Sequence, residues 1–182
     1  IAPASSGRIS TAGASMPSQK PSVAAVQGPA IGGGLGLALM PDFRVACAEA
    51  RFAANFTRLG FHPGFSLTFT LPRLIGQQKA NLMFYTGRRI GGEQAYEWGM
   101  ADVLVPLADV RKEAIKLAQE IAESAPLAVM STRETMRRGF ADAAEIATER
   151  ELTEQDWTRK TEDFKEGVKS YAEKRPGNWK NR

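Results

Sequence analysis

Cysteine and histidine are nearly absent from this 182-residue chain, which contains one of each, Cys47 and His62. A single cysteine forms no disulfide framework, and one cysteine with one histidine does not supply a protein-only zinc site. No apolar run reaches transmembrane length, and residues 1–19 lack the apolar core of a signal peptide. We therefore expect no metal site and no membrane partner, with the cytoplasm as the default location.

Charge of one sign is not concentrated either. The formal net charge is +4, from 24 Lys and Arg against 20 Asp and Glu. No basic stripe with interleaved aromatic residues is present, so nucleic-acid binding is not favoured. A basic mouth for a phosphorylated small molecule would have the same composition. The hydrophobic content of 43% is sufficient for a core, in one domain or one domain with an appendage.

Residues 20–42 contain the most informative pattern. Residues 22–26 are apolar and typical of a buried strand, and Gly28 and Pro29 then turn the chain. Gly32, Gly33 and Gly34, which we call the glycine corner, precede an apolar helical run at 35–40. Without Cβ atoms another group approaches the backbone closely, and the first helical N–H groups have no partners. The corner suits a polarised carbonyl oxygen or an anion; the alternative is a tightly packed turn.

Two nucleotide-binding motifs are missing from this stretch. A dinucleotide fingerprint needs a third glycine three residues after the pair Gly34-x-Gly36, where the chain has Leu39. A P-loop needs Gly-Lys-Ser/Thr, which the stretch does not contain. The glycines therefore do not indicate a nucleotide site of either kind.

The rest of the chain predicts an α/β fold in three parts. Residues 1–19 are rich in Ser, Ala and Gly and are expected to be a flexible segment. In residues 20–106, predicted strands are mixed with predicted helices. After residue 42 the strands are at 43–48, 51–53, 88–90 and 103–105, and the helices are at 66–75, 77–85 and 92–98. Residues 107–182 are helical, with an apolar stripe of Leu107, Val110, Ala114, Leu117 and Ile121, then helices over 124–140 and 142–174, the last interrupted near 161–163.

Motifs spread over residues 20–182 resemble the crotonase (enoyl-CoA hydratase/isomerase) superfamily. They include Lys20-Pro21-x-Val23-Ala24-Ala25-Val26-x-Gly28, Ala30-x-Gly32-Gly33-Gly34, Leu71-Pro72-Arg73-Leu74-Ile75-Gly76, Gly99-Met100-Ala101-Asp102 and Glu173-Lys174-Arg175. The resemblance implies a crotonase-like ββα spiral over 20–106 and a helical C-terminal trimerisation region over 107–182. On spacing alone, that region would equally serve as a helical cover on its own domain.

The resemblance also implies an acyl-CoA site in which two backbone N–H groups hold the thioester carbonyl oxygen while charge grows on it. Gly33, beside Gly32, matches the second donor. The first donor belongs to a family N-terminal part that is expected to be missing here; the Ala14 N–H is its candidate, although Ala14 lies closer to Lys20 than the family pattern has it. No cofactor is implied, because coenzyme A is carried as part of the substrate.

Both acid/base glutamates of the family hydratases are expected to be replaced. The first position, two residues after the third glycine, holds Gly36, and the second, four residues after Phe52, holds Phe56. Neither side chain transfers a proton, which counts against simple hydratase or isomerase chemistry. His62 is the candidate general base, because an imidazole titrates near neutral pH; the alternative is a histidine hydrogen-bonded in its loop.

The remaining candidates are substrate contacts. Asn55 has an amide for hydrogen bonding, and Phe56 belongs to an aromatic stretch, Phe56, Phe61, Phe65 and Phe69, that forms core or lines an apolar acyl pocket. Lys174 matches a lysine that in some relatives meets the CoA phosphate from an adjoining subunit, and Tyr171 matches the family aromatic residue three positions earlier; a solvated basic turn is the alternative. The helical tail of the family packs between subunits, so the resemblance implies a homotrimer or hexamer.

Two functions follow from these residues. The first is an acyl-CoA enzyme of the enoyl-CoA hydratase/isomerase family with altered acid/base groups. The second is a non-catalytic acyl-CoA-binding homologue that acts as a sensor or regulatory subunit. The sequence does not name the acyl group.

Overall fold

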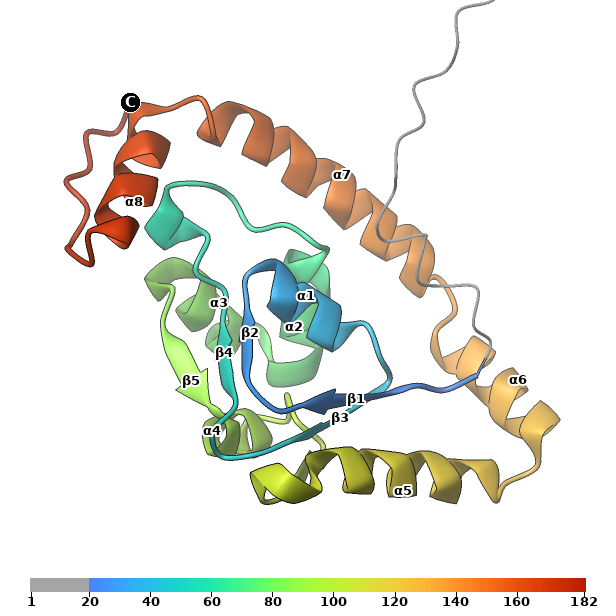
Figure 1. Ribbon diagram of the computed structural model, residues 1–182. Helices are drawn as coiled ribbons and strands as arrows, with labels where there is room; N and C mark the ends of the chain where they lie inside the picture. Colours follow the sequence, from blue (N-terminus) through green and yellow to red (C-terminus); the bar gives the residue numbers. More distant parts are fainter. Residues whose placement is uncertain (1–19) are drawn as a thin grey trace, which may run out of the picture.

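The computed structural model describes residues 20–182 (Figure 1), so the predictions for residues 1–19, including the Ala14 donor, lie outside it. The strands are β1 (Val23–Val26), β2 (Pro29–Ile31), β3 (Phe43–Ala46), β4 (Arg51–Ala53), β5 (Arg89–Gly91) and β6 (Val103–Leu104). The helices are α1 (Gly33–Leu39), α2 (Leu67–Ile75), α3 (Gln77–Thr86), α4 (Gly92–Glu97), α5 (Val110–Ala122), α6 (Pro126–Met136), α7 (Phe140–Thr158) and α8 (Glu162–Ala172), with 3-10 turns η1 (Thr57–Leu59) and η2 (Leu107–Asp109).

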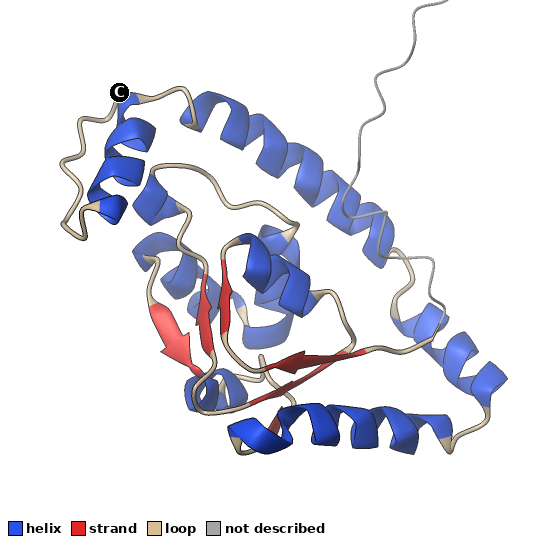
Figure 2. Cartoon of the chain, viewed as in Figure 1, coloured by secondary structure: helices blue, strands red, loops and turns tan. Residues whose placement is uncertain are grey.

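The strands form two small sheets that the chain visits in turn. In the first, with the order β1-β3-β6, all pairs are parallel. In the second, with the order β2-β4-β5, β2 and β4 are parallel and β5 is antiparallel to β4. Each pair of successive strands, β1 and β2, β3 and β4, and β5 and β6, places one strand in each sheet, so each turn adds one strand to each sheet. This winding is the ββα spiral that the sequence predicts (Figure 2).

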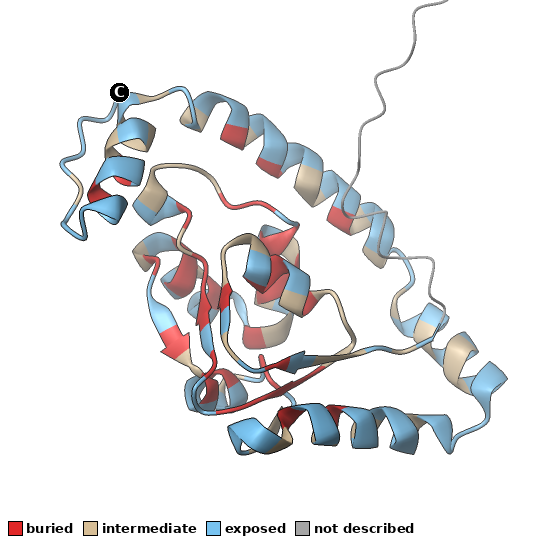
Figure 3. Cartoon of the chain, in the orientation of Figure 1, coloured by how far each residue is buried: buried red, intermediate tan, exposed pale blue. Residues whose placement is uncertain are grey.

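The core lies where the two sheets meet the helices between them (Figure 3). Its members come from every turn of the spiral and include the fully buried side chains Val45, Phe52, Leu67, Met83 and Ile90. Close packing of such residues fixes the relative positions of β2, β4 and α1. The glycine corner is therefore held on a rigid support.

The C-terminal helices form an arc around this core (Figure 1). Helix α5 packs on β1 and β3, α7 packs on α2, and α8 packs on η1. Val110 and Ala114 of the predicted stripe are buried and Leu117 packs on the core, whereas Leu107 lies in η2 and is exposed. The helices thus cover their own domain, as one of the two sequence-based alternatives has it.

Three predicted boundaries need comment. The turn predicted at residues 27–29 is confirmed at 27–28, between β1 and β2, but Pro29 is already the first residue of β2, a strand beside β4 that was not predicted. The helix expected over 124–140 is too long: α6 ends at Met136, and Gly139 has a left-handed φ of 72° before α7 begins. The predicted interruption near 161–163 is confirmed, since the Thr161 hydroxyl caps α8 by accepting from the Phe164 N–H at 3.0 Å.

Candidate functional site

The glycine corner joins β2 to α1. Gly32 has φ 55° and ψ −118°, a conformation that residues with a Cβ rarely adopt, and its N–H donates to the Ala53 carbonyl at 2.9 Å. Gly33 is the first residue of α1, so its N–H has no acceptor within the helix. Among residues 20–182 no other backbone acceptor is found for it. The Gly33 N–H is therefore a candidate donor to a bound group.

Three side chains surround the corner. A Cβ added to Gly32 would lie 3.4 Å from Asn55 Oδ1 and 3.8 Å from the Phe56 ring. A Cβ added to Gly33 would lie 2.8 Å from the Phe65 ring, and one added to Gly36 would lie 2.5 Å from the Phe65 Cβ. The structure thus brings Asn55 and Phe56, two of the predicted substrate contacts, against Gly32, the residue before the candidate donor. Phe65 joins them from the aromatic stretch.

Phe65 and Ser66 both have left-handed backbones, with φ values of 64° and 55°. The Glu151 carboxylate on α7 accepts from the Ser66 N–H at 2.7 Å, from the Thr68 N–H at 2.9 Å and from the Thr68 hydroxyl at 2.7 Å. Burial raises the pKa of the Glu151 carboxyl, and these hydrogen bonds only partly oppose the shift. Glu151 thus takes the place of a side-chain cap at the start of α2.

Sequence reasoning did not find Glu151. One face of α7 meets the start of α2 and the loop before it. Its residues are Ala144, Thr148, Glu151 and Gln155, at spacings of four, three and four. This is a helical stripe, but its members are small or polar, so a search for apolar stripes passes over it. A search for residues at helical spacing that ignores their polarity would have found this face of α7.

The other phenylalanines of the stretch mostly form core. Phe56 meets Phe61 edge to face with ring centres 5.4 Å apart, and Phe61 meets Phe164 of α8 at 5.5 Å. Phe69 points elsewhere, packing on Phe140 of α7 at 5.1 Å. Phe56 and Phe65 therefore reach the corner, while Phe61 and Phe69 fasten helices to the domain. The lining of an acyl pocket by this stretch remains a prediction.

The structure does not bring His62 to the corner by any recorded contact. Its ring Nδ1 lies 2.8 Å from the Pro63 carbonyl oxygen. Its backbone N–H donates to the Thr158 hydroxyl at 3.3 Å, and its carbonyl accepts from Gln155 Nε2 at 3.0 Å. These contacts fasten the loop to α7, which fits the alternative reading of a loop histidine. The catalytic role remains a prediction.

Tyr171 and Lys174 lie together at the end of α8. They line a groove of about 760 Å³ with Arg58, Arg89 and Trp179, and the Tyr171 hydroxyl accepts from Arg89 at 3.2 Å. Several cations of a single chain thus gather where the resemblance places a CoA phosphate contact. No contact recorded for this groove reaches the glycine corner.

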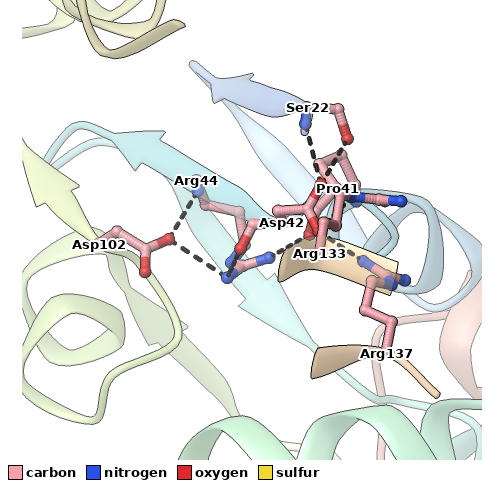
Figure 4. Close-up of polar contacts among 7 residues, drawn as sticks. All are labelled: Ser22, Pro41, Asp42, Arg44, Asp102, Arg133 and Arg137. Atoms are coloured by element: carbon pink, nitrogen blue, oxygen red, sulfur yellow. Dashed lines mark hydrogen bonds and ion pairs between the residues drawn. The ribbon is translucent and has the colours of Figure 1, made fainter. Parts of the chain in front are cut away.

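A partly buried polar cluster joins α6 to the starts of β1 and β3 (Figure 4). Asp42 accepts from Arg133 Nε at 3.0 Å, from Arg137 Nη1 at 2.8 Å and from the Ser22 N–H at 2.9 Å. Burial raises the pKa of the Asp42 carboxyl, but the hydrogen bonds from Arg137, Ser22 and Arg133 outweigh it, so the pKa lies below its ordinary value. Beside it, Arg44 joins β3 to Asp102 at 3.2 Å.

Within residues 20–182, no group of three or more His, Cys, Asp or Glu side chains is arranged to hold a metal ion. In the same part of the chain, no helix combines the length and the hydrophobicity needed to cross a membrane.

Comparison with known proteins places these features in a family. The family model for enoyl-CoA hydratase/isomerase matches residues 13–182. Carnitinyl-CoA dehydratase of Escherichia coli strain K12 is 36% identical over 167 residues, which is 90% of this chain. The chain spans 64% of the length of that relative.

Solved structures agree. An enoyl-CoA hydratase/isomerase from Pseudoalteromonas atlantica T6c superimposes with a TM-score of 0.87 at 29% identity, covering 97% of this chain and 73% of that one. A carnitinyl-CoA hydratase from Mycobacterium avium gives a TM-score of 0.84 at 34% identity, covering 90% and 64%. These matches confirm the predicted crotonase-like fold, and the chain belongs to the enoyl-CoA hydratase/isomerase family.

Proposed function

We propose that this chain binds an acyl-CoA thioester at the glycine corner, with the carbonyl oxygen accepting a hydrogen bond from the Gly33 N–H. The observation that carries the proposal is that N–H group, which has no backbone acceptor among residues 20–182. The Phe65 ring lies against Gly33, and Asn55 and Phe56 lie against the preceding Gly32. A fixed donor aimed at a developing oxyanion typically contributes about 3 kcal/mol. The Ala14 N–H is proposed as the other donor, the one that comes first in the family pattern, and coenzyme A enters only as part of the ligand.

Simple hydration is not the reaction we propose. Adding water to a 2-enoyl group needs a base for the water and an acid for the neighbouring carbon. The positions that the family resemblance assigns to these groups hold Gly36, against the Phe65 Cβ, and buried Phe56. Both oxygens of the nearby Glu151 carboxylate accept hydrogen bonds from α2. An altered reaction through a thioester oxyanion, with His62 as the base, is the first candidate.

A non-catalytic acyl-CoA-binding homologue is the second candidate. The observation that favours it is the set of His62 contacts, which run to Pro63 and to Thr158 and Gln155 of α7. If His62 only holds its loop, the corner has a donor for the carbonyl but no group that moves a proton. Such a protein would report or regulate acyl-CoA levels.

The groove at the end of α8 is proposed to hold the CoA phosphate. Lys174 and Tyr171 line it together with Arg58 and Arg89, and guanidinium and ammonium groups are the usual phosphate partners in proteins. A phosphate in the groove would reach these cations either from the chain's own ligand or from that of an adjoining subunit in the proposed trimer or hexamer.

Titration calorimetry tests the binding proposal. The full chain should bind acetyl-, butyryl- and crotonyl-CoA with comparable or greater affinity than free coenzyme A, because only the thioesters present a carbonyl to Gly33. Lys174→Ala should weaken binding of CoA more than of dephospho-CoA. No binding of any thioester by a folded sample at millimolar concentration would contradict the proposal.

Hydration of crotonyl-CoA, followed by the loss of enoyl absorbance, separates the candidates from an ordinary hydratase. We expect a rate at or near background, since each missing acid/base group typically costs about a hundred- to ten-thousand-fold. Rapid hydration would show that Gly36 and Phe56 are not the acid/base positions. If a reaction is found with another thioester, His62→Gln should abolish it with little change in affinity; a fully active variant would exclude His62 as the base.

A further inference from the structure

Phe65 fills space at the glycine corner that a side chain from α1 would otherwise enter. Its ring lies 2.8 Å from the point where Gly33 would carry a Cβ, and its own Cβ lies 2.5 Å from the corresponding point on Gly36. The Phe65 Cβ is fixed to the backbone and cannot swing aside as the end of a long side chain can. Phe65 remains 50% exposed, so part of it packs on the corner and part is open.

Phe65 is held in this place by an acidic side chain more than eighty residues away in sequence. The left-handed backbone at Phe65 and Ser66 is unfavourable for residues with a Cβ. Glu151, 1% exposed, fixes the next turn through the Ser66 and Thr68 N–H groups. The Ser66 hydroxyl adds a bond to the Ala144 carbonyl at 2.9 Å. Helix α7 thus determines where the Phe65 ring lies.

On the basis of the proposed thioester site, we propose that Phe65 selects acyl groups that are unbranched next to the carbonyl, and that Glu151 is the positioning residue that holds its ring against the glycine corner. A carbonyl oxygen about 2.9 Å from the Gly33 nitrogen puts the neighbouring acyl carbon close to the ring. A straight chain then lies along the ring as an apolar contact. A methyl branch at that carbon has to occupy volume that the ring already fills.

The packing of Phe65 on the corner is tested without any ligand. Gly36→Ala should lower the melting temperature of the full chain by roughly 4–8 °C, because the new Cβ overlaps that of Phe65. In a Phe65→Gly background, which removes the opposing Cβ and suits a left-handed residue, the same substitution should be neutral or stabilising. Equal losses in both backgrounds would show that Phe65 does not fill this space and would overturn the proposal.

Selectivity is tested with butyryl-CoA and isobutyryl-CoA, which differ only in the branch next to the carbonyl. Calorimetry should show that the native chain binds the straight isomer about tenfold more tightly, within the range expected when one misplaced methyl group meets a filled pocket. Phe65→Gly should bring the two affinities to within about twofold. Phe69→Ala, a matched loss of a phenylalanine that packs on Phe140 away from the corner, should leave the ratio unchanged.

Glu151→Gln tests the positioning role. It should lower the ratio of butyryl-CoA to isobutyryl-CoA affinity in the native background and leave it unchanged in the Phe65→Gly background, because Glu151 acts through Phe65. A variant that only loses stability, with an unaltered ratio, would overturn the role of Glu151. An unaltered ratio in Phe65→Gly would overturn that of Phe65. If neither the native chain nor any variant binds either isomer, the proposed function is overturned as well. If both isomers bind but with the same affinity ratio in the native chain and in every variant, only this inference is overturned.

Discussion

The glycines of this chain serve different physical needs. Gly32 is required for its left-handed φ of 55°. Gly33 and Gly36 leave room for the side chain of Phe65. Gly92, at the start of α4, leaves room for backbone: an added Cβ would lie 1.8 Å from the Cys47 carbonyl oxygen. Replacing any of them has a cost that depends on whether the neighbouring atom can move.

Gly92→Ala is expected to be the severe case. Neither α4 nor the backbone after β3 can yield as a side-chain tip would, so we expect a loss of about 3 kcal/mol or more in the free energy of unfolding. Urea denaturation followed by circular dichroism measures it. The neighbouring Gly91 is the control, because a Cβ there would meet nothing closer than 3.8 Å. A loss from Gly91→Ala as large as that from Gly92→Ala would contradict the explanation.

Single-residue contacts mark the limit of what the sequence predicts. The glycine triplet is predictable because it is local, and Phe56 because it lies at a fixed offset from Phe52, whereas Asn55 is a candidate through its amide alone. The hydrogen bond between Glu151 and Ser66 joins residues 85 positions apart, and neither the residue types nor their spacing predicts it. The consequence for Phe65, a ring placed on the corner by a distant helix, therefore needed the fold.

At the scale of elements, α6 is locked to the start of β1 and β3 by one carboxylate. Arg133 and Arg137, one helical turn apart, both reach Asp42, which also accepts from the Ser22 N–H (Figure 4). The side chains of both arginines are 16% exposed. A charge cluster with this little exposure contributes more than a surface ion pair does.

Asp42→Asn should weaken this lock. At neutral pH we expect a loss of about 1–3 kcal/mol in the free energy of unfolding, because arginine donors lose a charged acceptor in a partly buried site. The native pKa of Asp42 lies below its ordinary value of 3.8, so near and below that pH the unfolded chain binds more protons than the native one. The stabilisation from Asp42 is therefore fully present above pH 3.8 and is lost as the pH falls below it.

Thermal melts of the native chain and of Asp42→Asn across this pH range provide the check. The difference between the two melting temperatures should be largest near neutral pH and should shrink in acid. Asp156→Asn is the control, because Asp156 pairs with Lys160 on the exposed side of α7, both about 70% exposed. A difference for Asp42→Asn that does not change with pH would show that its charge is not what stabilises the native chain.

The elements themselves were largely predictable, and the two errors have physical causes. Strand β2 has three residues and begins at a proline, so its extended form depends on pairing with β4 more than on its own residues. The break between α6 and α7 lies at Gly139, inside a run of good helix formers. A single glycine is tolerated in a helix, so the residue type alone does not predict the turn that the left-handed φ of Gly139 makes here.

At the scale of the whole molecule, α8 closes the domain through two glycines. A Cβ on Gly60 would lie 2.5 Å from the Asp163 carbonyl oxygen, and one on Gly167 would lie 2.5 Å from the Leu59 carbonyl carbon. Helix α8 and η1 therefore touch backbone to backbone, which sets Lys174 beside Arg58 in the phosphate groove.

Gly167→Ala should separate α8 from η1 and weaken CoA binding, while the Asp42 cluster stays intact. Calorimetry with free CoA measures the affinity, and an unchanged affinity would contradict the prediction.

The outer face of α7 leads to the last prediction. Its inner face carries Glu151 and Gln155, whereas Ile146 and Trp157, about three helical turns apart on the opposite side, are 68% and 56% exposed. Large apolar side chains on one face of a helix are typical of a surface that another chain covers. We therefore expect a homotrimer or hexamer by light scattering at micromolar concentration. Replacing both residues by Asp should reduce it to smaller species, because carboxylates would have to be buried without partners. Tyr85→Asp, at a 76% exposed site on α3, is the control and should leave the mass of the assembly unchanged. A native chain that is monomeric under these conditions would show that no second copy covers the exposed face of α7.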